Sequence, residues 1–216
     1  MKKMTTLIVA LCLLLTVTAC GNQGSATAQT EVTTLTGEDA FTSQIELLDE
    51  SMTYYAEIEI ADYGTITVQL DQTAAPITAA NFVALAESGF YDGLTFHRII
   101  SGFMVQGGDP EGNGTGGSET KIKGEFAANG WDNPIKHERG VISMARSKAY
   151  DSASSQFFIM HADAPHLDGG YAAFGCVTEG MDVVDAICND ARPTDNNGSI
   201  ASDAQPVMTK VTIRAE

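Results

Sequence analysis

The chain has 216 residues, a length that suits one sizeable domain or two small ones, and 44% of them are hydrophobic, enough to bury a core. It carries 12 basic and 28 acidic residues, for a net charge of −16. So acidic a chain repels nucleic acid and anionic lipid headgroups, which argues against partners recognised through phosphate contacts.

The first twenty residues have the pattern of an export signal. Lys2 and Lys3 precede an uncharged, mostly apolar run over residues 7–19, which is shorter than the roughly 20 residues of a membrane-spanning helix. The run ends in VTAC, which resembles the lipobox of bacterial lipoproteins. That resemblance implies a signal peptide over 1–19 and a diacylated Cys20, whose two acyl chains suffice for stable anchoring. An ordinary secretory signal followed by a chance Cys is the alternative.

Residues 20–52 are rich in Thr, Ser, Ala, Gln and Gly, so we expect a flexible linker between the lipid anchor and a folded domain over 53–216. Within it, the segment FTSQIELL at 41–48 forms a helical turn, docks on the domain or does neither. The expected location is outside the cytoplasm, on the bacterial cell membrane.

In chain order, the domain begins with alternating residues at 54–60 and 65–70, which predict a β-hairpin. A short amphipathic helix follows, with Pro76 in its first turn and Gly89 just past its end. Further strands are predicted at 95–100, 103–107, 140–145, 156–160, 172–177 and 207–214, and a second helix at 181–188. About eight strands and two helices without βαβ alternation predict an antiparallel barrel or sandwich capped by helices.

Strand 95–100 contains a charged residue among apolar ones. Simple alternation places Arg98 on the same face as Phe96 and Ile100, and it places Gln106 beside Met104 after the next turn. Taken alone, both are most simply surface positions whose stems lie over apolar neighbours.

Several other chemistries are disfavoured by context. GNGTGG at 112–117 satisfies the dinucleotide-binding pattern, but no helix pattern follows it, so the glycines are better explained by sharp turns. The four histidines lack metal-ligand spacing, and Ser154 and Ser155 lack a nucleophile elbow. Paired-carboxylate hydrolysis remains a minor alternative. Cys176 and Cys188 either form a disulfide or remain buried free thiols.

Five motifs in order identify a resemblance. FHRIISGFMVQGGDP at 96–110, GNGTGG at 112–117, ISMAR at 142–146, SQFFI at 155–159 and LDGGYAAFG at 167–175 resemble the cyclophilin family of peptidyl-prolyl isomerases. The likeness runs from about residue 54 to the C-terminus. It implies a mainly β fold, an eight-stranded closed antiparallel barrel capped by two short helices, with no cofactor and no metal.

The resemblance also implies roles. Arg98 is similar to the family's catalytic arginine, with Gln106 beside it. Walls of a proline pocket are implied at Phe103, Met104, Phe158 and Leu167. Other implied substrate contacts are a groove-lining Gln156, a backbone strip at Ala145 and Arg146, and Gly114 in a loop beside a neighbouring pocket.

Two positions depart from the best-known members. His166 stands where many carry Trp, and Tyr171 where they carry His. A Trp at the first position is associated with tight cyclosporin binding, so His166 implies weaker affinity for that drug. The second change keeps an aromatic wall with a polar tip.

The function implied is isomerisation of X-Pro bonds in exported polypeptides, by a protein that need be no more than a monomer. Rotation requires breaking amide resonance, and in the twisted state the proline nitrogen becomes a hydrogen-bond acceptor. A fixed donor such as Arg98 therefore favours the transition state over both ground states. The rival hypothesis is a tethered module that only binds proline-containing segments; it would need the apolar pocket but not the donor.

Overall fold

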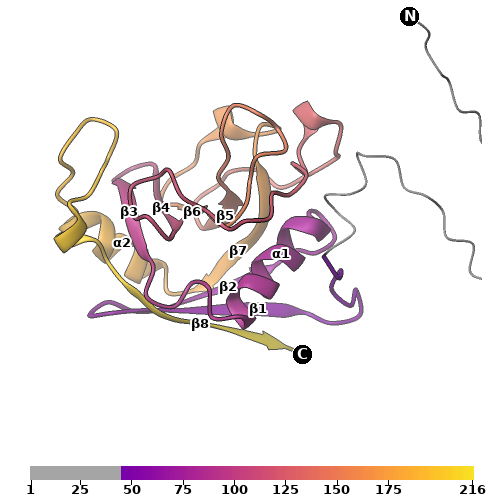
Figure 1. Ribbon diagram of the computed structural model, residues 1–216, viewed down its shortest axis with the longest axis horizontal. Coiled ribbons are helices and arrows are strands. Elements are labelled where there is room, and N and C mark those ends of the chain that lie inside the picture. Colours follow the sequence, from indigo (N-terminus) through magenta and orange to yellow (C-terminus); the bar gives the residue numbers. More distant parts are fainter. Residues whose placement is uncertain (1–44) are drawn as a thin grey trace, which may run out of the picture. The chain divides into compact units, whose positions relative to one another are not determined.

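The structure, a computed structural model, describes residues 45–216, in which eight strands and two α-helices are assigned. The strands are β1 (Tyr54–Ile60), β2 (Gly64–Leu70), β3 (Thr95–Ile100), β4 (Met104–Asp109), β5 (Val141–Met144), β6 (Phe157–Met160), β7 (Ala172–Glu179) and β8 (Met208–Ala215). The helices are α1 (Pro76–Glu87) and α2 (Met181–Asp190). Every predicted element is present, and the predicted strand ends differ from the observed ones by at most two residues. Figure 1 shows the two helices set apart from each other along the sheet.

All eight strands belong to one antiparallel sheet with the order β3-β4-β6-β5-β7-β2-β1-β8. The strand order begins at β3 and ends at β8, so the sheet is curled but open and the expected closed barrel is not formed. The edge of β3 is joined to the chain around the start of β8 by an isolated bridge between Thr95 and Val207 and by hydrogen bonds from Phe96 N to Pro206 O at 3.0 Å and from Met208 N to Leu94 O at 2.8 Å. Beyond that bridge the edge of β3 pairs instead with the chain before β8, through Ile99 N to Gly198 O at 2.8 Å and Ile200 N to His97 O at 2.9 Å.

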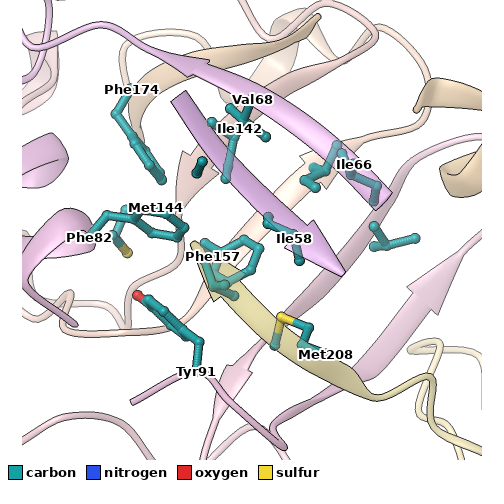
Figure 2. Close-up of a cluster of buried hydrophobic side chains, with 14 of the residues drawn as sticks. Ile58, Ile66, Val68, Phe82, Tyr91, Ile142, Met144, Phe157, Phe174 and Met208 are labelled. Carbon is teal, nitrogen blue, oxygen red and sulfur yellow. The ribbon is translucent and has the colours of Figure 1, made fainter. Parts of the chain in front are cut away.

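The main core fills the concave side of this sheet. Ile58, Ile66 and Val68 alternate inward from β1 and β2 and are fully buried. Phe82 of α1 packs against the rings of Tyr91, Phe174 and Phe157, with centroids 5.0, 5.3 and 5.4 Å away (Figure 2). Burial of these large rings fixes α1 against the sheet, since removing one such ring typically costs about 3–5 kcal/mol.

Helix α1 is more deeply buried than an amphipathic surface helix. Thr78 and Asn81, two polar residues of this helix, are both buried. Glu125 satisfies Thr78, because its carboxylate accepts hydrogen bonds from Ile77 N, Thr78 N and Thr78 Oγ1 at 2.7–2.9 Å. Asn81 Nδ2 donates to Ser154 O at 2.6 Å. A buried anion at the helix N-terminus satisfies donors that have no partner inside the helix.

Three further sequence-based expectations concern the N-terminal residues and the two cysteines of the domain. The signal peptide, Cys20 and residues 41–44 lie outside the described residues, and no helix within 45–216 is long and apolar enough to cross a bilayer. Residues 45–48 are not helical, and Ile45 and Leu48 pack against the core. Cys176 and Cys188 are both free thiols; Cys188 is buried, but Cys176 is exposed.

Candidate active site

The β3–β4 hairpin positions Arg98, and a register shift decides where this residue points. Phe96 pairs with Gly107 and Arg98 pairs with Gln106, so two steps along β3 match one step along β4. A bulge of this kind re-aims the following side chain. As a result Phe96 lies in the main core with Ile99, whereas Arg98 contacts Met104 on the other side of the hairpin. The expectation that Arg98 and Phe96 share a face was therefore wrong.

The guanidinium of Arg98 is held at two of its three nitrogens. Its Nε donates to Asn197 O at 2.7 Å, and its Nη1 donates to Gln106 Oε1 at 3.1 Å. Nη2 makes no hydrogen bond to any residue in 45–216. Burial lowers the pKa of Arg98 below its ordinary value, but an arginine remains charged at neutral pH. The side chain is thus a fixed cation with unused donors.

Gln106 continues the chain of hydrogen bonds away from Arg98. Its Nε2 donates to Gln156 Oε1 at 2.9 Å, and Gln156 Nε2 donates to Gly116 O at 2.8 Å. Because Gln106 uses its carbonyl on Arg98 and its amide on Gln156, the orientation of its amide group is determined. The row of polar groups links β3 to the 112–117 loop.

A cavity of about 160 Å³, here called the Arg98 cavity, lies beside this row. Its apolar walls are Phe103, Met104, Phe158, Leu167 and Tyr171, and its polar side is formed by Arg98 and Gln106. Ala145 and Arg146 complete the lining. All nine residues are among those selected from the sequence, so the structure brings these positions together around one cavity.

Three predicted residues lie outside the lining of the Arg98 cavity. His166 stacks on Phe103, with ring centroids 5.7 Å apart and planes 27° apart. Tyr171 meets Phe158 edge-on at 5.7 Å. Gly114 and Gln156 do not line the Arg98 cavity; they line a neighbouring pocket.

The side chain of Arg146 is engaged by the protein itself. Its Nε and Nη2 donate to Gly170 O at 2.9 and 2.7 Å. Its guanidinium carbon lies 4.7–5.2 Å from the ring centroids of Phe126, Tyr150 and Tyr171. These contacts of the Arg146 guanidinium therefore hold in place the wall between the Arg98 cavity and the neighbouring pocket.

The neighbouring pocket, here called the Lys121 pocket, has a volume of about 250 Å³ and shares Gln106, Ala145 and Arg146 with the Arg98 cavity. It is polar. Its other side chains are Lys121, Gln156 and the hydroxyls of Thr115, Ser147, Ser152 and Ser154. Lys121 was not singled out from the sequence, because an exposed lysine carries no local signal.

Asp109, at the end of β4, organises the loop that borders the Lys121 pocket. Its carboxylate accepts from the backbone N–H groups of Glu111, Asn113 and Gly114 at 2.6–3.1 Å. Burial favours a higher pKa for Asp109, but these backbone donors outweigh it and lower the pKa below its ordinary value. A Cβ on Gly116 would overlap this carboxylate, so the loop needs glycine there. The glycines of this loop predict its turns, but nothing in the local sequence pattern indicates the role of Asp109.

A second missed group lies behind Phe158. His137 is buried, its ring stacks on Phe158, and its nitrogens lie 3.1 Å from Asp168 Oδ1 and 3.0 Å from Ser143 Oγ. Burial lowers the pKa of His137 despite the opposing effect of Asp168. Ser143 is fully buried, so this arrangement supports the cavity wall and presents no accessible nucleophile.

His97, at the bulge, lines a third pocket of about 720 Å³ on the far side of Arg98. It is 4% exposed, and neither ring nitrogen has a hydrogen-bond partner within 45–216. Burial lowers its pKa, which keeps the imidazole neutral near pH 7. In this part of the chain no group of three His, Cys, Asp or Glu side chains is placed to hold a metal ion.

Comparison with known proteins agrees with this arrangement. Residues 55–215 match the family model of the cyclophilin-type peptidyl-prolyl cis-trans isomerases. A peptidyl-prolyl cis-trans isomerase of Helicobacter pylori is 50% identical over 137 residues, covering 62% of this chain and 81% of its own. Peptidyl-prolyl cis-trans isomerase B of Bacillus subtilis is 48% identical over 130 residues, covering 60% of this chain and 87% of its own.

A crystal structure of a cyclophilin-type isomerase from Cryptosporidium parvum, described as in the presence of the dipeptide Ala-Pro, superposes with a TM-score of 0.65. It is 31% identical, and the match covers 74% of this chain and 98% of that one.

Proposed function

The chain belongs to the cyclophilin-type peptidyl-prolyl cis-trans isomerases, and from this premise we propose that the Arg98 cavity holds the proline of an X-Pro bond during isomerisation. In this proposal Arg98 donates a hydrogen bond to the proline nitrogen as the amide twists. Its substrates are proline-containing polypeptides, as the family implies.

Catalysis of this rotation requires a hydrogen-bond donor that acts on the twisted amide and not on the planar one. In the planar amide the nitrogen lone pair is delocalised, and the barrier to rotation is about 18–20 kcal/mol. In the twisted state the lone pair is localised on nitrogen and accepts a hydrogen bond. A preorganised donor thus stabilises the transition state more than it stabilises the cis or the trans ground state.

One observation carries the proposal: Arg98 is fixed at Nε by Asn197 and at Nη1 by Gln106, and Nη2 is left without a partner among residues 45–216. Holding the guanidinium in place avoids reorganisation during the reaction. The adjoining apolar walls exclude water and strengthen the contact. Gln106 either orients Arg98 or hydrogen-bonds the substrate backbone, and its hydrogen bond to Nη1 of Arg98 favours the first role.

The remaining substrate contacts follow the two cavities. Phe103, Met104, Phe158 and Leu167 surround the pyrrolidine ring, and Tyr171 and His166 extend that wall. The backbone at Ala145 and Arg146 binds the substrate main chain, with Gln156 and Gly114 beside the neighbouring pocket. Comparing cis-trans exchange of a short X-Pro peptide with the wild type and Arg98→Ala tests this assignment; near-normal exchange in the variant would refute it.

We further propose that the enzyme works on exported polypeptides from the outer side of the cell membrane. Support comes from the sequence: two lysines, a 13-residue apolar run and the lipobox-like VTAC ending at Cys20. Residues 1–19 would be removed, Cys20 would carry the lipid, and 20–52 would connect it to the domain over 53–216.

Cell fractionation with Cys20→Ser beside the wild type tests the anchor, and mass spectrometry of the mature N-terminus tests the modification. The anchor predicts a membrane-bound wild type with a diacylated Cys20 and a variant that leaves the membrane fraction. An unmodified wild-type N-terminus would contradict it.

A further inference from the structure

We propose that the Lys121 pocket selects substrates with an acidic side chain two residues from the proline. The inference rests on the proposed function, because it assigns this pocket to the same bound peptide. It names Lys121 as a specificity-determining residue, and the recognised chemistry is a carboxylate.

The lining of the pocket is suited to an anion. Four hydroxyls, two amide side chains and the cations Lys121 and Arg146 surround it, and no Asp or Glu among residues 45–216 lines it. Such a bias is unexpected in a chain with 28 acidic residues. An incoming carboxylate therefore meets hydrogen-bond donors and positive charge without a competing anion.

Lys121 is the lining residue whose hydrogen-bond donors are not all used by residues 45–216. Its Nζ donates to Ser154 Oγ at 3.3 Å, and no carboxylate within 45–216 lies within ion-pair distance. By contrast, Lys210 and Arg139 are each paired with an aspartate. An ammonium group has three donors, so Lys121 keeps two for a ligand.

The position of the acidic residue follows from the shared wall. Gln106, Ala145 and Arg146 line both cavities, so the two are separated by one row of side chains. In an extended peptide, side chains on the same face are two residues apart, at a spacing of about 6.5–7 Å. A proline in the Arg98 cavity therefore places the side chain at −2 or +2 over the Lys121 pocket.

The test uses the full chain and two series of short peptides containing one Ala-Pro bond. Each series carries Glu, Gln or Lys, two residues before the proline in one and two residues after it in the other. Enzyme-catalysed exchange between cis and trans is measured by NMR at equal peptide concentrations. In one series we expect Glu to be processed about two- to fivefold faster than Gln, and Lys more slowly, on the scale of a partly exposed ion pair. The preference should shrink in 0.5 M salt.

Charge reversal provides the decisive comparison. Lys121→Glu should invert the order of the Glu and Lys peptides, and this ratio is independent of how much of the enzyme is folded. The matched control is Lys123→Glu, which changes an exposed lysine two positions away that does not line the pocket; it should keep the wild-type order. Equal rates for the three peptides in both series, or the same inversion with Lys123→Glu, would overturn the inference while leaving isomerisation intact. Failure of the wild type to accelerate even the Gln peptides would instead contradict the proposed function.

Discussion

Arg98 and Gln106 are direct partners across the β3–β4 ladder, and Nη1 of the arginine donates to Oε1 of the glutamine at 3.1 Å. The pairing depends on the register shift between Phe96 and Arg98. A bulge in an edge hairpin thus turns a charged residue away from the main core and toward an apolar cavity, where a fixed donor is most effective.

Removing the glutamine should therefore weaken catalysis through Arg98. Gln106→Leu is close in size and leaves Nη1 without its acceptor, and we expect exchange of an X-Pro peptide to slow about tenfold, the low end for a hydrogen bond to a charged group. In the Arg98→Ala background the same change should cost little more, because the two residues act as a unit. Additive losses in the double variant, measured by the same NMR exchange, would show that Gln106 acts independently.

Cyclosporin affinity should respond to the residue that stacks on Phe103. His166→Trp enlarges the aromatic surface beside the cavity and adds an indole N–H donor, so we expect the dissociation constant to fall about tenfold or more. Isothermal titration calorimetry measures the change. Tyr63→Trp, in the β1–β2 turn, is the control and should bind as the wild type does. An unchanged affinity in His166→Trp would contradict the expectation that His166 weakens cyclosporin binding.

Asp109 should make stability depend on acid pH. Its folded pKa is lowered below the ordinary value of about 3.9, so its contribution is fully present above about pH 4 and is lost as the pH falls through the folded pKa. Asp109→Asn should lower the free energy of unfolding by about 2 kcal/mol at pH 7. Urea unfolding at several pH values should show the two proteins converging below pH 4.

The exposed Asp132 provides the matched control, since its carboxylate makes no hydrogen bond within the described chain. Asp132→Asn should leave the unfolding curve almost unchanged. A difference between the wild type and Asp109→Asn that stayed constant down to pH 3 would argue against the backbone hydrogen bonds as the source of the stability.

Catalysis itself should vary little between pH 7 and 9. Burial lowers the pKa of His97 and of His137, the two buried histidines next to the site, so both are neutral throughout that range. Arg98 stays charged because even a lowered arginine pKa lies far above it. We expect kcat/KM to change by less than about twofold. A bell-shaped profile with limbs inside this range would require an acid or base that the mechanism does not contain.

Alternation and helical periodicity predicted the strands in chain order and both helices. The motif resemblance predicted the residues around the Arg98 cavity, which lie far apart in the chain. Prediction from the sequence failed where one contact overrides local periodicity. The bulge at His97 reverses the alternation that placed Arg98 beside Phe96. Glu125 buries Thr78 and the start of α1 across a separation of 47 residues. The extent of barrel closure likewise depends on which segment pairs with the edge of β3. Alternation along a strand shows which face is buried, but it does not predict which segment the strand pairs with.

The most direct test of the account is NMR exchange of a short X-Pro peptide with the wild type, Arg98→Ala and Arg98→Lys, with Arg192→Ala as a control. Arg192 is exposed, and its only hydrogen bonds to residues 45–216 are to the carbonyls of Asn189 and Ala191. We expect Arg98→Ala to lose about 10²–10³-fold in catalysed exchange, the scale of a lost preorganised donor. Arg98→Lys should recover little, because an ammonium group cannot reproduce the planar fork. Arg192→Ala should match the wild type. Exchange by folded Arg98→Ala within a few fold of the wild-type rate would contradict the role of Arg98.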